Sequence, residues 1–141
     1  MRSTIVHVLL LSILGFAAQA QPGQVTFPID QRFTLDTLNG KPVAERVTLT
    51  IALAGNRKNH FANGVAGCNG WFGEINALGP GELRFGTIAM TSIERCQADT
   101  IKKFEAGFES ALEQVTRWRF EGGTLILEGA GNSLGFTASA R

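Results

Sequence analysis

The sequence predicts an α+β domain that is mainly β, in which about eight short antiparallel strands curl into a partly open barrel around one helix. Several segments alternate apolar and polar residues, as strands with one buried face do. Residues 97–115 instead repeat apolar residues three and four apart, which is the helical spacing. Seventeen glycines supply tight turns between the segments. A helix with one apolar stripe needs a sheet to cover it, and a curled antiparallel sheet is the simplest cover.

The first two strands are expected at residues 32–38 (RFTLDTL) and 47–53 (VTLTIAL). The second of these has the clearest alternation in the chain. Asn39-Gly40 between them is a strong turn signal, and Pro42 is expected to delay the next strand.

Three further strands are expected before the helix. The first is the weakest, because Asn63-Gly64 interrupts it and suggests a bulge or bend. A tight loop is expected at residues 78–81. The three strands cover residues 60–66, 70–76 and 82–89.

The helix is expected over residues 97–115, with Asp99 in its first turn, where the helix dipole favours an acid. Gly107 lowers helix propensity, so we expect it to allow close packing. The apolar stripe consists of Ile101, Phe104, Phe108, Ala111, Leu112 and Val115.

Three helical glutamates, Glu105, Glu109 and Glu113, repeat four residues apart. Such a row is either a binding face or a solvated outer face, and we expect the solvated face.

The end of the chain predicts a three-strand meander over residues 116–120, 124–128 and 133–139. Gly122-Gly123 and residues 129–132 are the turns. Residues 129–135 contain several glycines, but strand-like residues follow them, so a hairpin is expected and not a dinucleotide loop.

Residues 1–20 have the three parts of a secretory signal peptide. Arg2 precedes an apolar run at residues 5–16, which is too short to span a bilayer. A small-x-small motif predicts cleavage between Ala20 and Gln21. No cysteine lies near the cut, so we expect no lipid anchor, a single domain over residues 21–141, and a periplasmic or secreted location.

Charge and composition exclude several classes of protein. The chain has thirteen basic and twelve acidic residues, and because Arg2 belongs to the leader, twelve of each remain after cleavage. This balance argues against a nucleic-acid binder. A hydrophobic content of 44% argues against disorder.

Two cysteines, Cys68 and Cys96, allow one intramolecular pairing, which an oxidising compartment permits. A zinc site would need about four nitrogen or sulfur ligands, and His60 is the only histidine outside the leader. We therefore expect a disulfide and no metal or other cofactor.

The search for catalytic groups predicts no enzyme. The sequence contains no GxSxG nucleophile elbow whose serine His60 could activate. The two cysteines are expected to pair with each other, so neither is expected to act as a nucleophile. Trp71 and Trp118 could anchor a ligand, but core packing is the favoured interpretation. Arg117 and Arg119 are expected on the opposite strand face from Trp118.

Three stretches together resemble the META domain family, whose bacterial members include the heat-shock protein HslJ. Residues 33–43 (FTLDTLNGKPV) match the opening strand and turn. Gly67-Cys68-Asn69, with Gly73, matches the GCNxxxG signature. Residues 88–91 (IAMT), ending at Thr91, and Cys96 match the block before the helix, and Glu105 with Phe108 fits its ExxF pattern.

The resemblance implies a β-rich envelope protein that is associated with stress, and it does not imply an enzyme. We expect a non-catalytic accessory protein, a monomer, that contacts another envelope protein. The alternative is a carrier of a small hydrophobic molecule between sheet and helix, which a cavity lined by Phe104 or Phe108 would favour.

Overall fold

The computed structural model describes residues 25–55 and 58–140. The predicted signal peptide and the predicted cleavage site between Ala20 and Gln21 lie outside the described residues. Within the described ranges, no helix is long and apolar enough to cross a membrane.

The described chain forms nine strands, a 3-10 turn and one α-helix. Their bounds agree with most of the sequence prediction. The elements are β1 (Arg32–Leu38), β2 (Lys41–Pro42), β3 (Thr48–Leu53), β4 (His60–Ala66), β5 (Asn69–Gly79), β6 (Glu82–Met90), η1 (Glu94–Cys96), α1 (Asp99–Glu113), β7 (Arg117–Glu121), β8 (Thr124–Gly129) and β9 (Asn132–Ala138).

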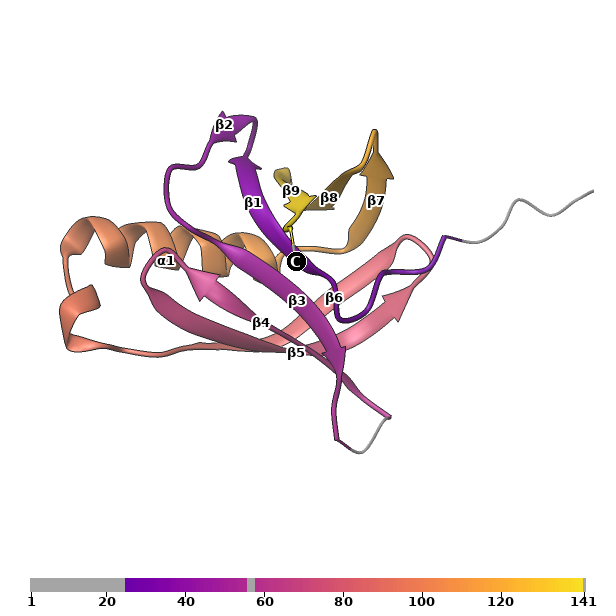
Figure 1. Ribbon diagram of the computed structural model, residues 1–141, viewed down its shortest axis with the longest axis horizontal. Helices are drawn as coiled ribbons and strands as arrows, with labels where there is room; N and C mark the ends of the chain where they lie inside the picture. Colours follow the sequence, from indigo (N-terminus) through magenta and orange to yellow (C-terminus); the bar gives the residue numbers. More distant parts are fainter. Residues whose placement is uncertain (1–24, 56–57, 141) are drawn as a thin grey trace, which may run out of the picture.

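The strands form one antiparallel sheet that closes on itself (Figure 1). Its order is β2-β1-β3-β4-β5-β6-β7-β8-β9, and β1 also pairs with β9, for example at Leu35 and Phe136. This pairing confirms the mainly β prediction and closes the barrel further than the partly open form that we expected. The pairing of β1 with β9 covers edges that an open antiparallel sheet would expose.

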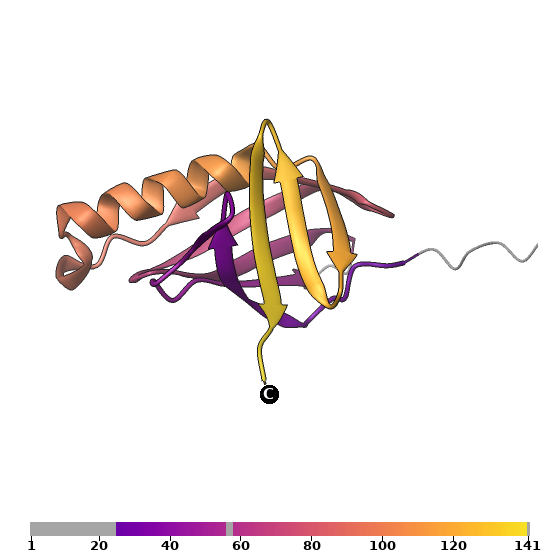
Figure 2. The same cartoon turned by 90° about the horizontal axis from the view of Figure 1, so that it is seen from above.

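Helix α1 lies along the barrel and contacts β6 and β9 (Figure 2). The strands β6 and β7 are joined in register only at Glu82 and Arg117, so the sheet opens beside the helix. The later part of the apolar stripe is buried, whereas Ile101 and Phe104 near the start are half-buried. The helix therefore packs mainly through its C-terminal half.

The structure corrects three local expectations in the strands. Pro42 does not delay the next strand, because Lys41–Pro42 pairs with Leu38 and Thr37 as the short strand β2. Strand β5 extends to Gly79, so only Pro80 and Gly81 form the turn. The register shifts lie between β5 and β6, and the pairing of β4 runs without interruption through Asn63 and Gly64.

Two glycines show where close packing requires a missing side chain. A Cβ on Gly64 would overlap the Thr48 carbonyl oxygen, so this glycine lets β3 approach β4. Gly107 was expected to serve close packing, and this expectation was wrong. It is exposed, and a Cβ there would meet nothing within 4 Å.

The barrel interior is filled by apolar side chains from every long strand and from the helix. The largest fully buried side chains are Phe33, Phe108, Phe136, Leu35, Leu49, Ile51, Leu83, Leu112, Leu125, Leu127, Leu134 and Val47.

Candidate functional site

The motif residues of the sequence meet at one end of helix α1, where the turn between β4 and β5 faces η1. Cys68 and Cys96 form a disulfide with a Cα–Cα distance of 5.7 Å, which confirms the predicted pairing. Cys96 is fully buried and Cys68 is half-buried. The bond ties the β4–β5 turn to the segment that leads into the helix.

Glu105 is the side chain that the sequence interpretation misplaced. It is only 5% exposed, although we expected it on a solvated face. One carboxylate oxygen accepts bonds from the backbone N–H groups of Asn69 at 2.8 Å and Cys68 at 3.4 Å. The other oxygen accepts a bond from the Asn69 side-chain amide at 2.8 Å. The burial of this carboxylate is therefore compensated by three donors from one turn.

A signal for this burial exists in the sequence. Glu105 lies four residues after Ile101 and three before Phe108, so it belongs to the apolar stripe as well as to the glutamate row. In the other two glutamates of the row the expectation holds better, since Glu109 is half-exposed and Glu113 is exposed.

Asn69 extends the hydrogen-bond network to the segment after β6. Its side-chain oxygen accepts a bond from the Ile93 N–H at 3.0 Å and one from the Thr91 hydroxyl at 3.4 Å. The Thr91 hydroxyl in turn accepts a bond from the Gly70 N–H at 3.0 Å. The side chain of one buried residue thus links the β4–β5 turn, the helix and the segment between them.

The motif has glycine at positions 67 and 73 for two different reasons. Backbone conformation favours glycine at Gly67, and close packing favours it at Gly73. Gly67 has a φ of +82°, a left-handed conformation that favours glycine, and its N–H donates to the Arg46 carbonyl at 2.8 Å. Gly73 lies where a Cβ would come within 3.3 Å of the Ile88 side chain, so its missing side chain allows β5 and the core to pack closely.

This arrangement supports a structural role for the motif. Both oxygens of Glu105 are occupied by internal donors, and both sulfur atoms are bonded to each other. Across residues 25–55 and 58–140, no group of three or more His, Cys, Asp or Glu side chains is arranged to hold a metal ion.

Both tryptophans belong to the core, as the sequence predicted. Trp71 and Trp118 are 3% and 4% exposed. Their indole N–H groups donate to the carbonyl oxygens of Thr48 at 3.0 Å and Gly79 at 2.9 Å. Each ring therefore packs in the interior while its single polar group is satisfied.

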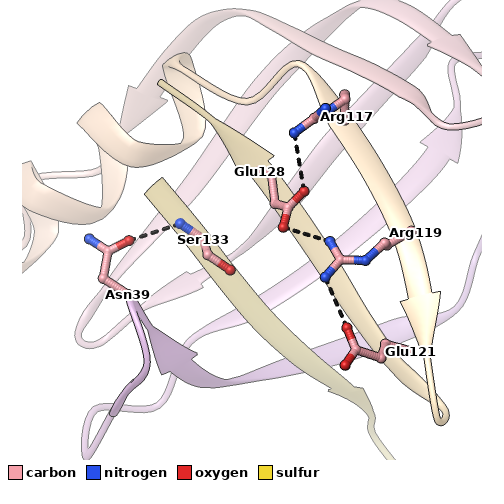
Figure 3. Close-up of polar contacts among 6 residues, drawn as sticks. All are labelled: Asn39, Arg117, Arg119, Glu121, Glu128 and Ser133. Atoms are coloured by element: carbon pink, nitrogen blue, oxygen red, sulfur yellow. Dashed lines mark hydrogen bonds and ion pairs between the residues drawn. The ribbon is translucent and has the colours of Figure 1, made fainter. Parts of the chain in front are cut away.

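The outer face of β7 and β8 carries a row of ion pairs (Figure 3). Glu128 contacts Arg117 at 3.4 Å and Arg119 at 2.6 Å, and Arg119 also contacts Glu121 at 2.9 Å. Hydrogen bonds from Arg119 to Glu128 and Glu121 raise the pKa of the Arg119 guanidinium above its ordinary value. Because the arginines are paired with acids and face solvent, this surface has little attraction for a nucleic-acid phosphate.

Figure 3 also shows the polar contact that accompanies barrel closure. The side-chain oxygen of Asn39 accepts a bond from the Ser133 N–H at 2.8 Å. The Asn39 N–H donates to the Ser133 carbonyl at 2.7 Å. The β1–β2 turn is thereby fastened to β9.

An apolar patch, which we define as Phe72, Ala89 and Met90, lies at the start of β5 and the end of β6. Phe72 and Ala89 are on the outer face, whereas Met90 pairs with the buried Trp71 and packs against the core. Phe72 is 52% exposed and pairs across the strands with Ala89. A shallow hollow of about 270 Å³ lies over Gly70 beside these three side chains and Thr91. An exposed aromatic ring beside a hollow is the kind of surface that proteins use for contacts.

A carrier function would be favoured by a cavity between the sheet and the helix. Among residues 25–55 and 58–140, none of the four hollows described is such a cavity. Neither Phe104 nor Phe108 lines any of these four. Phe108 is fully buried and contacts Trp71 with ring centroids 5.6 Å apart.

A comparison with known protein families shows which family this chain belongs to. The model of the META domain matches residues 24–141. The chain belongs to the META domain family. Cys68, Asn69, Thr91 and Glu105, which carried the resemblance in the sequence, all lie within the residues of this META domain that the family model matches. No curated protein sequence matches the chain.

Two solved structures share the fold of this META domain. An NMR structure of a protein from Burkholderia xenovorans has a TM-score of 0.60 and 22% identity, and the match covers 92% of this chain and 100% of that chain. A second NMR structure has a TM-score of 0.57 and 23% identity, with 84% and 95% covered. At these identities, the likeness concerns the fold alone.

Proposed function

We propose that this META domain is a non-catalytic, exported envelope protein of the HslJ type, related to stress, that acts by contacting another protein. The patch of Phe72, Ala89 and Met90 is the proposed contact surface. Its occupant is a folded envelope protein that presents an apolar side chain to the hollow over Gly70.

The observation that carries this proposal is the exposure of Phe72. A phenylalanine has no polar group to hold it at a surface, and more than half of this ring is open to solvent. Phe72 is not among the residues of the buried core cluster, so the ring is not needed to complete the core. Covering the ring with a partner would remove apolar surface from water, which is favourable.

Export and a stress role rest on different observations. Residues 1–20 have the pattern of a cleaved signal peptide, and the disulfide suits an oxidising compartment. The stress role rests on the family context, which includes a heat-shock protein. The oligomeric state that we propose is a monomer.

Site-specific photo-crosslinking in the intact envelope tests the contact. A photoreactive phenylalanine analogue at position 72 is expected to give a crosslink to one envelope protein. The same analogue at Ile126, which is half-exposed on β8, is the control and should not give that product. The added substitution Ala89→Glu places a charge beside the ring and should abolish the crosslink from position 72.

Two results would overturn the proposal. One is a set of crosslinks from position 72 that matches the set from position 126. The other is a product that persists at full yield in the Ala89→Glu variant, since a charge within the patch cannot be accommodated in an apolar contact.

A further inference from the structure

The barrel has a mouth that the core does not fill, at the end away from the first turns of α1. Residues 25–31, here called the strap, cross this mouth before β1 begins (Figures 1 and 2). The strap is anchored by Phe27, which is 6% exposed and meets the Trp118 ring edge-on at 5.1 Å. The Asp30 N–H donates to the Ile51 carbonyl at 2.8 Å and holds the strap to β3.

The walls of the mouth are formed by side chains that face inward near the ends of strands. His60 lies two residues before the fully buried Ala62 on β4, so it shares that inward face. Leu78 on β5 pairs with the fully buried Leu83, which places it on the inner side as well. Both side chains are half-buried, because the barrel ends at this level.

A hollow of about 270 Å³ lies between the strap and these walls. Its lining is mainly apolar, and His60 is its one ionisable side chain. The lining residues are Thr26, Phe27, Ile29, His60, Leu78, Gly79 and Pro80. Barrel mouths with apolar walls and a few polar groups are common sites for small molecules.

We propose that this mouth binds a small molecule with one aromatic ring and one hydroxyl group, which is a site distinct from the apolar patch and independent of the proposed protein contact. The volume is at the low end of ligand pockets, which suits a ligand with a single ring. The ring packs against Phe27 and Leu78.

The hydroxyl group of the proposed ligand is inferred from the hydrogen-bonding chemistry of His60. A neutral imidazole has one donor and one acceptor nitrogen, and a hydroxyl group also donates and accepts. A purely apolar ligand would leave the imidazole covered and without a partner, which costs free energy. The mouth should therefore prefer a phenol to the same ring without the hydroxyl.

NMR titration of the ¹⁵N-labelled exported protein with 4-methylphenol tests this inference, and toluene serves as the matched probe. We expect saturable shifts at the amides of Phe27, His60 and Leu78, and about tenfold weaker binding of toluene. His60→Leu keeps the wall apolar and should remove the preference for the phenol. Leu78→Trp fills the hollow and should abolish binding of both probes.

Phe72→Ala, in the separate apolar patch, is the matched control and should leave both titrations unchanged. The site does not exist if 4-methylphenol gives no saturable shifts, if the shifts centre on the patch instead, or if a folded Leu78→Trp protein binds as before. Equal binding of the two probes, or an unchanged preference in His60→Leu, would overturn the assignment of the hydroxyl to His60.

Discussion

Asn69 and Glu105 are joined by two hydrogen bonds of 2.8 Å, one from the backbone N–H of Asn69 and one from its side-chain amide. They are 36 residues apart in the chain and both are almost completely buried. The bonds fix the helix to the β4–β5 turn at the same place where the disulfide fixes that turn to η1. Two different kinds of link therefore hold one junction.

Replacing Glu105 by alanine is expected to lower the free energy of unfolding by about 3 kcal/mol, since both N–H groups of Asn69 would remain buried without acceptors. Urea unfolding followed by circular dichroism measures the change. Glu105→Gln keeps one acceptor oxygen and should lose less.

Glu109→Ala is the control for this substitution, because Glu109 lies one turn later and is half-exposed. It should change the stability by no more than about 0.5 kcal/mol. Equal losses in the Glu105→Ala and Glu109→Ala proteins would show that the buried network contributes nothing.

Loss of the disulfide is expected to destabilise the protein by about 3–4 kcal/mol, because the bond closes a loop between residues 28 positions apart. The double substitution Cys68→Ser with Cys96→Ser tests this in a denaturant titration. The hydrogen bonds of Asn69 should preserve the fold, so the variant should keep a dispersed NMR spectrum.

The mass of the intact protein gives an independent check on the bond. Before reduction the protein should be lighter by two hydrogens than after reduction, and it should have no thiol that reacts with maleimide. Two reactive thiols in the exported protein would contradict the disulfide.

Two glycine substitutions should have opposite effects. Gly129→Ala would drive its Cβ into the Gln114 carbonyl oxygen at the end of the helix, so we expect a loss of more than about 2 kcal/mol. Gly107→Ala meets nothing within 4 Å on an exposed helix position and should raise stability by up to about 1 kcal/mol.

Thermal unfolding of the two proteins in parallel measures the difference, with the unaltered chain as reference. A rise in Tm for Gly129→Ala, or a fall for Gly107→Ala, would contradict the packing described around each glycine.

Export predicts a defined N-terminus for the mature protein. Expression of the full chain with its leader should yield an envelope protein whose first residue is Gln21, as determined by N-terminal sequencing. Replacing Ala20 by a bulky residue such as phenylalanine should block cleavage and leave the leader attached. A cytoplasmic protein that begins at Met1 would show that the leader is not a signal peptide.

Local patterns were sufficient to predict most elements of this fold. The alternation in residues 47–53 and the helical stripe around Phe108 each reflect a side-chain period that depends only on local geometry. The extent of β5 was not predictable, because register shifts near Ile75 and Asn76 let the strand continue past the point where alternation fails. The pairing of β1 with β9 joins the two ends of the domain, which no local pattern encodes.

In the candidate site too, some features could be predicted from the sequence and others could not. The cysteine count and the predicted oxidising compartment were enough to predict the Cys68–Cys96 bond, and the resemblance to the family drew attention to Asn69 and Thr91. The role of Glu105 was missed because a carboxylate is ordinarily placed in water, and only donors brought from a distant turn make its burial favourable.

The amino-acid order by itself determined where strands and helix form, which cysteines pair and which family the domain resembles, because periodicity, composition and motif spacing are properties of the chain alone. Tertiary structure alone decided that the barrel closes, that Glu105 is buried, that Phe72 remains outside, and that His60 stands at an unfilled mouth. Each of these depends on which distant surfaces meet, and the free energy of such contacts arises only when the whole sheet is assembled.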